Sequence, residues 1–216
     1  SELGPVLPFA VGDVNGDGVT DLGAAAPGAL GGGEAPSLAP PQRSGLVLLL
    51  AMPAFPATHG TDRRLVPNAA AVFSGNAALG FQFAHPDQLL LQPLLSLGTA
   101  AVAIGDIDGN GATDLAMGAP NTNAECSARE LESVPGCGAV LIARLGPRGS
   151  PLPTSTVNTE HGMETRSPYF VLHPGKGGLP FSAVAGQFGA ALAPVGDMDG
   201  DGVPDLVVFA SGSDTI

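Results

Sequence analysis

An all-β fold built from repeated four-stranded antiparallel units is predicted by three features of the sequence. An acidic, glycine-rich segment occurs three times, beginning at residues 13, 106 and 197, so the repeat period is 93 and then 91 residues. Short apolar runs flank each of these segments. Gly (32) and Pro (21) make up about a quarter of the 216 residues, and they supply the turns that many short strands require.

The composition limits both the core and the partners of the chain. Hydrophobic residues make up 44% but aromatic residues only 5%, and Trp is absent, so the core must consist of Ala, Val, Leu and Ile in closely stacked layers. A net charge of −12 with only 8 Lys and Arg argues against nucleic acid as a partner, because a phosphate-binding groove needs clustered positive charge. No apolar run reaches the roughly 18 to 20 residues that cross a bilayer, so we expect no membrane insertion by this segment.

Each period is expected to contain four short strands. Alternating small and larger apolar residues precede the second and third acidic segments, as in a buried strand, and an Asp-Leu pair with another apolar run follows each segment. Strand, acidic turn and strand therefore form a hairpin, and two further apolar runs complete the first two units. The expected strands are residues 99–105 and 190–196 before the turns, 21–27, 114–120 and 205–211 after them, 45–50 and 138–143 in third place, and 70–74 and 169–172 in fourth place. Four antiparallel strands with small residues where sheets stack are typical of a propeller blade.

Three short motifs resemble the FG-GAP repeat of the β-propeller in integrin α subunits. They are Phe188-Gly189, the acidic segment that begins at Asp197, and Gly118-Ala119-Pro120, whose counterpart in the third repeat is Phe209-Ala-Ser211. The resemblance implies calcium in the acidic turns, an extracellular or cell-surface location and binding to other proteins. It covers nearly the whole chain.

The repeat period divides the chain into blades. We expect one FG-GAP propeller segment over residues 1–216, with blade one at about 1–96, blade two at 97–187 and the start of blade three at 188–216. Propellers close with about four to eight blades. The segment is therefore expected to be part of a longer chain, or to be completed by another one.

The acidic segments have the residue types and spacing of a calcium site. Positions 1, 3, 5 and 9 carry side-chain oxygens, position 7 can offer its backbone carbonyl, and glycines allow a tight turn. About three Ca²⁺ ions, one per segment, are expected. The predicted ligands are Asp13, Asn15, Asp17, Val19 and Asp21; Asp106, Asp108, Asn110, Ala112 and Asp114; and Asp197, Asp199, Asp201, Val203 and Asp205.

Other readings of these segments are weaker. An EF-hand needs a Glu at position 12, where this chain has Ala24, Met117 and Val208, and it needs flanking helices. Oxygen-only ligands exclude a typical zinc or iron site and leave magnesium or manganese as less suitable cations. The segments could also be plain Asx-Gly hairpin turns without an ion, but several carboxylates in one turn then repel one another.

Cys126 and Cys137 are the two cysteines of the chain. A disulfide between them would close a 12-residue loop and contribute about 3 kcal/mol, and the alternative is two free thiols. Pairing and calcium together indicate an extracellular location. No Asn-X-Ser/Thr sequon occurs, so the sequence gives no support for N-glycosylation.

Function is expected to reside in binding. The sequence contains no nucleophile motif and no phosphate-binding glycine loop, and its paired acidic residues lie inside the turns. We therefore expect a non-catalytic extracellular calcium-binding module for adhesion or protein assembly. The alternatives are a propeller appended to a larger secreted enzyme and a structural subunit of an extracellular fibre or coat. The expected partners are other proteins or the remainder of the chain's own propeller.

Strand direction assigns the connections to faces of the propeller. Residues 53–69 and 146–167 are expected on the face that carries the acidic turns. Residues 28–44 and 121–137 and the stretches near 85–96 and 174–187 are expected on the opposite face. Long loops on a rigid scaffold could bind a partner there, and the alternative is that they are disordered insertions.

Overall fold

The computed structural model describes residues 4–14, 17–29, 45–52, 68–74, 96–122, 136–152, 155–159, 162–173 and 186–211. Within these ranges the chain forms antiparallel strands and one short 3-10 turn, Pro147–Gly149, and contains no α-helix. Nothing in the described ranges is a helix of the length and apolar character needed to cross a bilayer. The expected all-β fold class is confirmed.

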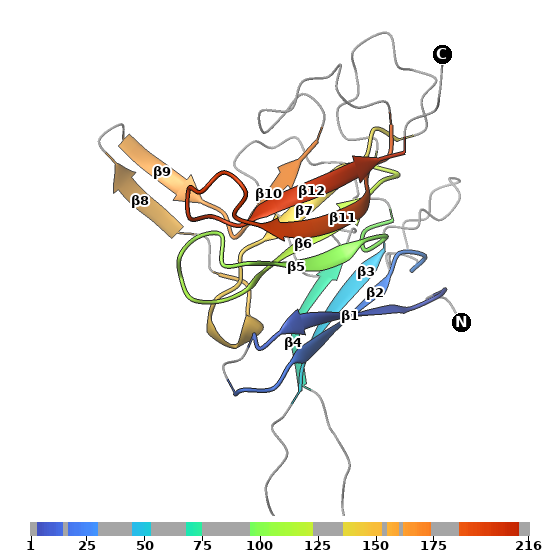
Figure 1. Cartoon of the computed structure of the whole chain (residues 1–216), viewed down its shortest axis with the longest axis horizontal. Helices are drawn as coiled ribbons and strands as arrows, with labels where there is room; N and C mark the ends of the chain where they lie inside the picture. Colours follow the sequence, from blue (N-terminus) through green and yellow to red (C-terminus); the bar gives the residue numbers. More distant parts are fainter. Residues whose placement is uncertain are drawn as a thin grey trace, which may run out of the picture.

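The first sheet contains four strands in sequential order. Each strand pairs antiparallel with the next, so β1 and β4 form the two edges (Figure 1). The strands are β1 (Leu7–Gly12), β2 (Asp21–Ala26), β3 (Leu46–Ala51) and β4 (Asn68–Ser74).

The second sheet repeats this four-stranded arrangement. A third sheet consists of a hairpin that corresponds to the first two strands of the other sheets. The second sheet has the order β10-β7-β6-β5, and β11 pairs with β12. The strands are β5 (Ala101–Gly105), β6 (Asp114–Ala119), β7 (Ala139–Ala143), β10 (Tyr169–Leu172), β11 (Phe188–Gly196) and β12 (Asp205–Ala210). Two four-stranded units and a hairpin agree with partial propeller blades. The exact division into blades at residues 96 and 187 stays a prediction.

One pair of strands was not expected from the sequence. Strands β8 (Ser155–Thr159) and β9 (Gly162–Arg166) form a separate antiparallel hairpin between β7 and β10, within the stretch 146–167 that was expected to be a plain connection. Both strands are mostly polar and lack the apolar alternation that marks a half-buried strand. Figure 1 shows this hairpin projecting from the stacked sheets.

The sheets stack face to face around two apolar layers. In β6, Leu115, Met117 and Ala119 pack toward the first sheet, whereas Ala116 packs toward β11 and β12. Strand β6 is therefore buried at every residue, because it is covered on both faces. Strand β7 divides in the same way, with Leu141 in the first layer. Burying a Leu or Met side chain contributes roughly 1.5 to 3 kcal/mol, so these two layers are the main source of stability.

Glycines that precede the third strands allow neighbouring sheets to come close. Gly45 forms a parallel bridge with Leu97, and Gly138 forms one with Phe188. Both glycines have a positive φ, 77° and 80°. A Cβ atom on Gly138 would lie 2.2 Å from the backbone oxygen of Phe188, so the contact requires a residue without a side chain.

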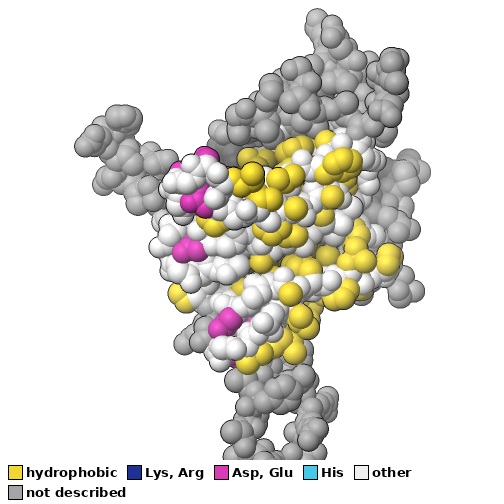
Figure 2. Space-filling view, viewed as in Figure 1, with side chains coloured by type: hydrophobic (Ala, Val, Ile, Leu, Met, Phe, Trp, Pro, Cys, Tyr) yellow, Lys and Arg dark blue, Asp and Glu magenta, His cyan; other side chains and the backbone are white. Residues whose placement is uncertain are grey.

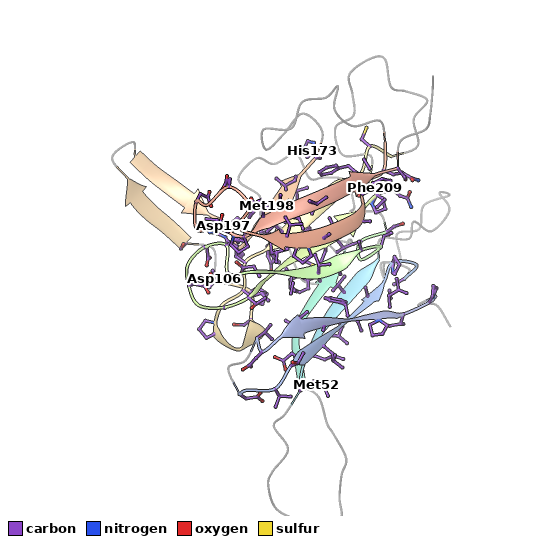
Figure 3. The ribbon with its side chains drawn as sticks, in the orientation of Figure 1. Met52, Asp106, His173, Asp197, Met198 and Phe209 are labelled. Carbon is purple, nitrogen blue, oxygen red and sulfur yellow. The ribbon has the colours of Figure 1, made fainter. Side chains whose placement is uncertain are left out.

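The outer face of the third hairpin is apolar and exposed. Val207 and Phe209 of β12 are 51% and 57% exposed, and Val195 of β11 is also exposed. Val208, which lies between Val207 and Phe209 in β12, faces the second sheet instead. Figure 3 shows Phe209 on β12, and Figure 2 shows apolar side chains across this side of the molecule. No strand in the described ranges pairs with the second edge of β12.

Candidate metal sites

The three acidic turns lie along one side of the stacked sheets. They connect β1 to β2, β5 to β6 and β11 to β12. Figure 2 shows acidic side chains in three groups along this side, and Figure 3 labels Asp106 and Asp197 in two of the turns. We refer to residues 13–21, 106–114 and 197–205 as the first, second and third loops.

A bulge introduces each loop at the same place. The strand register shifts immediately before Gly12, Gly105 and Gly196, and these glycines have φ values of 77°, 85° and 72°. A bulge of this kind bends the strand and redirects the side chain that follows. It directs the first Asp of each loop into the turn.

The second loop is folded around its own side chains. Asp106 accepts hydrogen bonds from the backbone N–H of Asn110 (3.0 Å, Oδ1) and of Gly111 (2.7 Å, Oδ2). The Asn110 side-chain oxygen accepts one from the N–H of Ala112 at 2.7 Å. Oxygen atoms of Asp106, Asp108 and Asp114 all lie within 4.8 Å of one another. The loop therefore brings three predicted ligands together.

The third loop has the same internal hydrogen bonds. Asp197 accepts from Gly200 and Asp201 on Oδ1, at 2.7 and 3.1 Å, and from Gly202 on Oδ2 at 2.9 Å. Oxygen atoms of Asp197, Asp199 and Asp205 also lie within 4.8 Å of one another. The fifth-position Asp201 is outside this group and accepts a hydrogen bond from the N–H of Val203 at 2.7 Å.

The first loop is described only in part. Asp13 accepts hydrogen bonds from the N–H groups of Asp17 (3.0 Å) and Gly18 (2.7 Å), as the first Asp does in the other two loops. Asn15, the predicted third-position ligand, lies outside the described residues. In the described part of this loop, Asp13, Asp17 and Asp21 do not form a group of the kind seen in the other two loops.

For the residues at position 7, the hydrogen bonds seen in the structure involve the backbone N–H group. The N–H of Val19 donates to Asp17 at 2.9 Å, as those of Ala112 and Val203 do to their own fifth-position side chains. Ligation of an ion by the carbonyl groups of these three residues stays a prediction.

The Asp at position 9 has a structural role that the sequence did not reveal. Asp114 is fully buried, and it accepts from the N–H of Ile107 at 2.9 Å and from the N–H of Leu145, which follows β7, at 2.7 Å. Asp21 makes the equivalent bonds to Val14 (2.8 Å) and Met52 (2.6 Å).

The side chains of Asp21 and Asp114 therefore tie the first and second loops to the ends of the third strands of their sheets. The bonds place the start of both connections between the third and fourth strands beside the acidic loops. Asp205 accepts from Met198 at 2.7 Å, and the described ranges contain no third strand for it.

The environment moves the pKa values of two carboxyl groups in opposite directions. Burial raises the pKa of Asp114 to about 6, against the effect of its hydrogen bonds from Leu145 and Ile107, and the nearby Asp108 and Asp106 raise it further. Desolvation also acts to raise the pKa of Asp106, but backbone N–H groups outweigh it, so this pKa lies below its usual range. In the absence of a cation, the second loop thus concentrates negative charge that the protein only partly compensates.

The donor set of the second and third loops suits a hard cation. Each loop gathers carboxylate oxygens from three Asp residues, and no nitrogen or sulfur donor belongs to either group. Ca²⁺ takes six to eight oxygen ligands in a flexible geometry, and it would relieve the repulsion among the grouped carboxylates. The side chains grouped in these loops are therefore compatible with calcium.

A comparison with protein-family models matches the chain at the second and third loops. The sequence model of the FG-GAP repeat matches residues 98–128 and 188–215. These two segments of the chain therefore resemble FG-GAP repeats. The first match contains β5, the second loop and β6, and the second match contains the β11–β12 hairpin with the third loop. No curated protein matches the chain.

The FG-GAP motifs lie where one sheet meets the next. Gly118 belongs to Gly118-Ala119-Pro120 and Gly189 to Phe188-Gly189, and a Cβ atom on Gly118 would lie 2.0 Å from the backbone oxygen of Gly189. The family-model match at residues 98–128 and 188–215 confirms the resemblance seen in the sequence. Of the two cysteines, Cys137 is buried, and Cys126 lies outside the described residues, so their pairing stays a prediction.

Proposed function

We propose that this FG-GAP chain is a non-catalytic, extracellular, calcium-binding propeller module that serves adhesion or protein assembly. The observation that carries the proposal is the grouping of carboxylate oxygens within 4.8 Å in two equivalent loops, Asp106, Asp108 and Asp114 in one and Asp197, Asp199 and Asp205 in the other. About three ions are proposed, one per loop, because the first loop has the same hydrogen bonds around Asp13.

The ions would act as structural clamps. Each loop joins the first two strands of its unit, and in the first two units the ninth Asp also binds the chain just after the third strand. An ion in the loop would therefore fix three strands relative to one another. At about 1 mM free calcium, with the affinity of extracellular modules, each site would contribute roughly 0.4 to 1.4 kcal/mol to stability.

The partner surface is proposed to include the third hairpin. Asp205 repeats the bond of Asp114 to its own loop, but it has no third-strand N–H in the described ranges. The second edge of β12 and the exposed side chains of Val207 and Phe209 could therefore accept a further strand and sheet. The remainder of a propeller, or another protein, would supply them.

The extracellular location has two lines of support. FG-GAP repeats are typical of extracellular or cell-surface proteins, and the predicted disulfide between Cys126 and Cys137 would suit an oxidising compartment. A structural subunit of an extracellular fibre or coat is a second candidate function. It is favoured by the exposed apolar face of β11 and β12, because such a face can dock to a neighbouring subunit.

Calorimetry tests the proposed function. The protein is melted in EGTA and in 1 mM CaCl₂, with 1 mM MgCl₂ as the control cation. We expect a higher Tm in calcium than in EGTA and a smaller effect of magnesium. Equal melting temperatures in EGTA and calcium would contradict the proposal.

A further inference from the structure

Among the residues that the structure describes, one cationic side chain lies against the second loop. Arg144 directly follows β7, and its Nη1 atom is 3.9 Å from Oδ2 of Asp108, the third-position residue of the loop. Both side chains are largely shielded, with 20% of Arg144 and 17% of Asp108 exposed.

The position of Arg144 is fixed by bonds outside the loop. Its N–H donates to the carbonyl of Pro168 at 2.8 Å, and its carbonyl accepts from the N–H of Leu152 at 3.2 Å. Its Nη2 donates to the carbonyl of Ser167. Its Nε is buried without a hydrogen-bond partner in the described ranges. The guanidinium is thus anchored on the β10 side, with its charge directed toward Asp108.

The first repeat has no charge at the equivalent place. Leu115 is opposite Ala143 in the second sheet, and Leu22 is opposite Leu50 in the first, so the counterpart of Arg144 is Ala51. In the third unit, no described residue follows a third strand. Among the described repeats, a cation at this position is particular to the second loop.

The loops also differ in their own charge. The third loop has Asp at positions 1, 3, 5 and 9, whereas the second loop has Asn110 at position 5. The Asn110 side chain is already engaged, because its Nδ2 donates to the carbonyl of Leu145 at 2.8 Å and its Oδ1 accepts from Ala112. With Arg144 included, the second loop has a net charge of −2 and the third a net charge of −4.

We propose that Arg144 lowers the calcium affinity of the second loop, so that the third loop fills first as calcium rises. The inference rests on the proposed function, since it requires that these loops bind calcium. The guanidinium repels an arriving divalent cation and competes with it for Asp108. A unit positive charge about 6 Å from a divalent ion, at a dielectric constant close to that of water, weakens binding on the order of tenfold.

Each loop contains a glycine amide that can report its occupancy. The N–H of Gly111 donates to Asp106 in the second loop, and that of Gly202 donates to Asp197 in the third. The full chain, labelled with ¹⁵N and freed of metal with EGTA, is titrated with CaCl₂ while both amide resonances are followed. In the wild type we expect the Gly202 resonance to reach its midpoint at a lower calcium concentration than that of Gly111.

Substitutions separate the charge of Arg144 from its structural contacts. In Arg144→Gln the Gly111 midpoint is expected to fall about tenfold toward lower calcium, and the Gly202 midpoint to stay unchanged as an internal control. Arg144→Met is a second neutral variant, in case the glutamine disturbs folding. Arg144→Lys keeps the positive charge and is expected to leave the Gly111 midpoint close to that of the wild type.

The outcomes distinguish this inference from the proposed function. If both amides respond to calcium but neither neutral variant moves the Gly111 midpoint, the role of Arg144 is refuted and calcium binding stands. The same holds if the lysine variant shifts the midpoint as far as the glutamine variant does. If neither amide responds to calcium in the wild type, the proposed function is refuted and the inference fails with it.

Discussion

Replacing Gly138 with alanine tests whether the sheets are held together at their glycine junctions. Gly138 has φ of 80°, and an added Cβ would lie 2.2 Å from the backbone oxygen of Phe188 and 2.3 Å from its nitrogen. These distances are about 1 Å shorter than even a compressed contact between nonbonded heavy atoms. The neighbouring backbone belongs to β11 and cannot rotate away as a side chain could. The third hairpin must therefore shift from the second sheet.

The expected loss of stability follows from the hydrogen bonds that this shift of the hairpin would break. The N–H of Gln187 donates to the carbonyl of Gly136 at 2.8 Å, and the N–H of Phe188 donates to that of Cys137 at 2.9 Å. Losing two buried hydrogen bonds costs roughly 2 to 4 kcal/mol, and alanine at a positive φ adds about 1 kcal/mol. Gly138→Ala is thus expected to lower the unfolding free energy by about 3 to 5 kcal/mol.

Gly12→Ala is the matched control for this experiment. Gly12 has φ of 77°, but an added Cβ would meet nothing within 4 Å, so only the backbone cost of about 1 kcal/mol is expected. Both variants are unfolded with urea and followed by circular dichroism. Amide exchange should also show faster exchange at Gln187 and Phe188 in Gly138→Ala alone. Equal destabilisation by the two variants would refute the close approach of the sheets.

Three further predictions concern carboxylates and cysteines. Asp114→Asn removes one of two buried acceptors and should cost about 2 to 3 kcal/mol in urea unfolding of the calcium-free protein at about pH 4, where the native Asp114 carboxyl group is neutral. Asp205→Asn, at a more exposed site with one such bond, should cost under about 1 kcal/mol, and equal costs would contradict the assigned role. Because burial raises the pKa of Asp114 to about 6, the native state binds this proton more tightly than the unfolded chain. In the calcium-free protein, the stabilisation that Asp114 provides is therefore full below about pH 4 and is lost by about pH 6. This fall of about 3 kcal/mol should be absent in Asp114→Asn, and the same pH slope in both proteins would contradict this prediction. Denatured protein kept without reductant should show no reactive thiol, and reduction of the Cys126–Cys137 bond should lower stability by about 3 kcal/mol; detection of two thiols would contradict the pairing.

The strands and loops that could be predicted are those whose signal is local. The second and third loops are recognisable in the sequence because the Asp residues that group together, such as Asp106 and Asp108, are close in sequence. Glycines with positive φ bring them together. Strands such as β7 are apolar throughout because both faces are buried, and this produces a clear run in the sequence. Local residue choice and tertiary packing agree in these elements.

The features that could not be predicted depend on contacts between distant segments. The bond between Asp114 and Leu145 joins residues 31 apart, and nothing near Asp114 indicates a second acceptor role. The contact of Arg144 with Asp108 likewise exists only because β7 ends beside the second loop. The β8–β9 hairpin was missed for another reason, since its polar strands carry no periodic apolar signal.

The acidic loops are proposed to hold calcium, and anomalous diffraction can locate the ions themselves. Crystals grown with millimolar CaCl₂ would be measured at a long wavelength, where calcium scatters anomalously. We expect a peak about 2.3 to 2.6 Å from the carboxylate oxygens of Asp106, Asp108 and Asp114, and another beside Asp197, Asp199 and Asp205. Well-ordered loops with no anomalous peak at either position would contradict it.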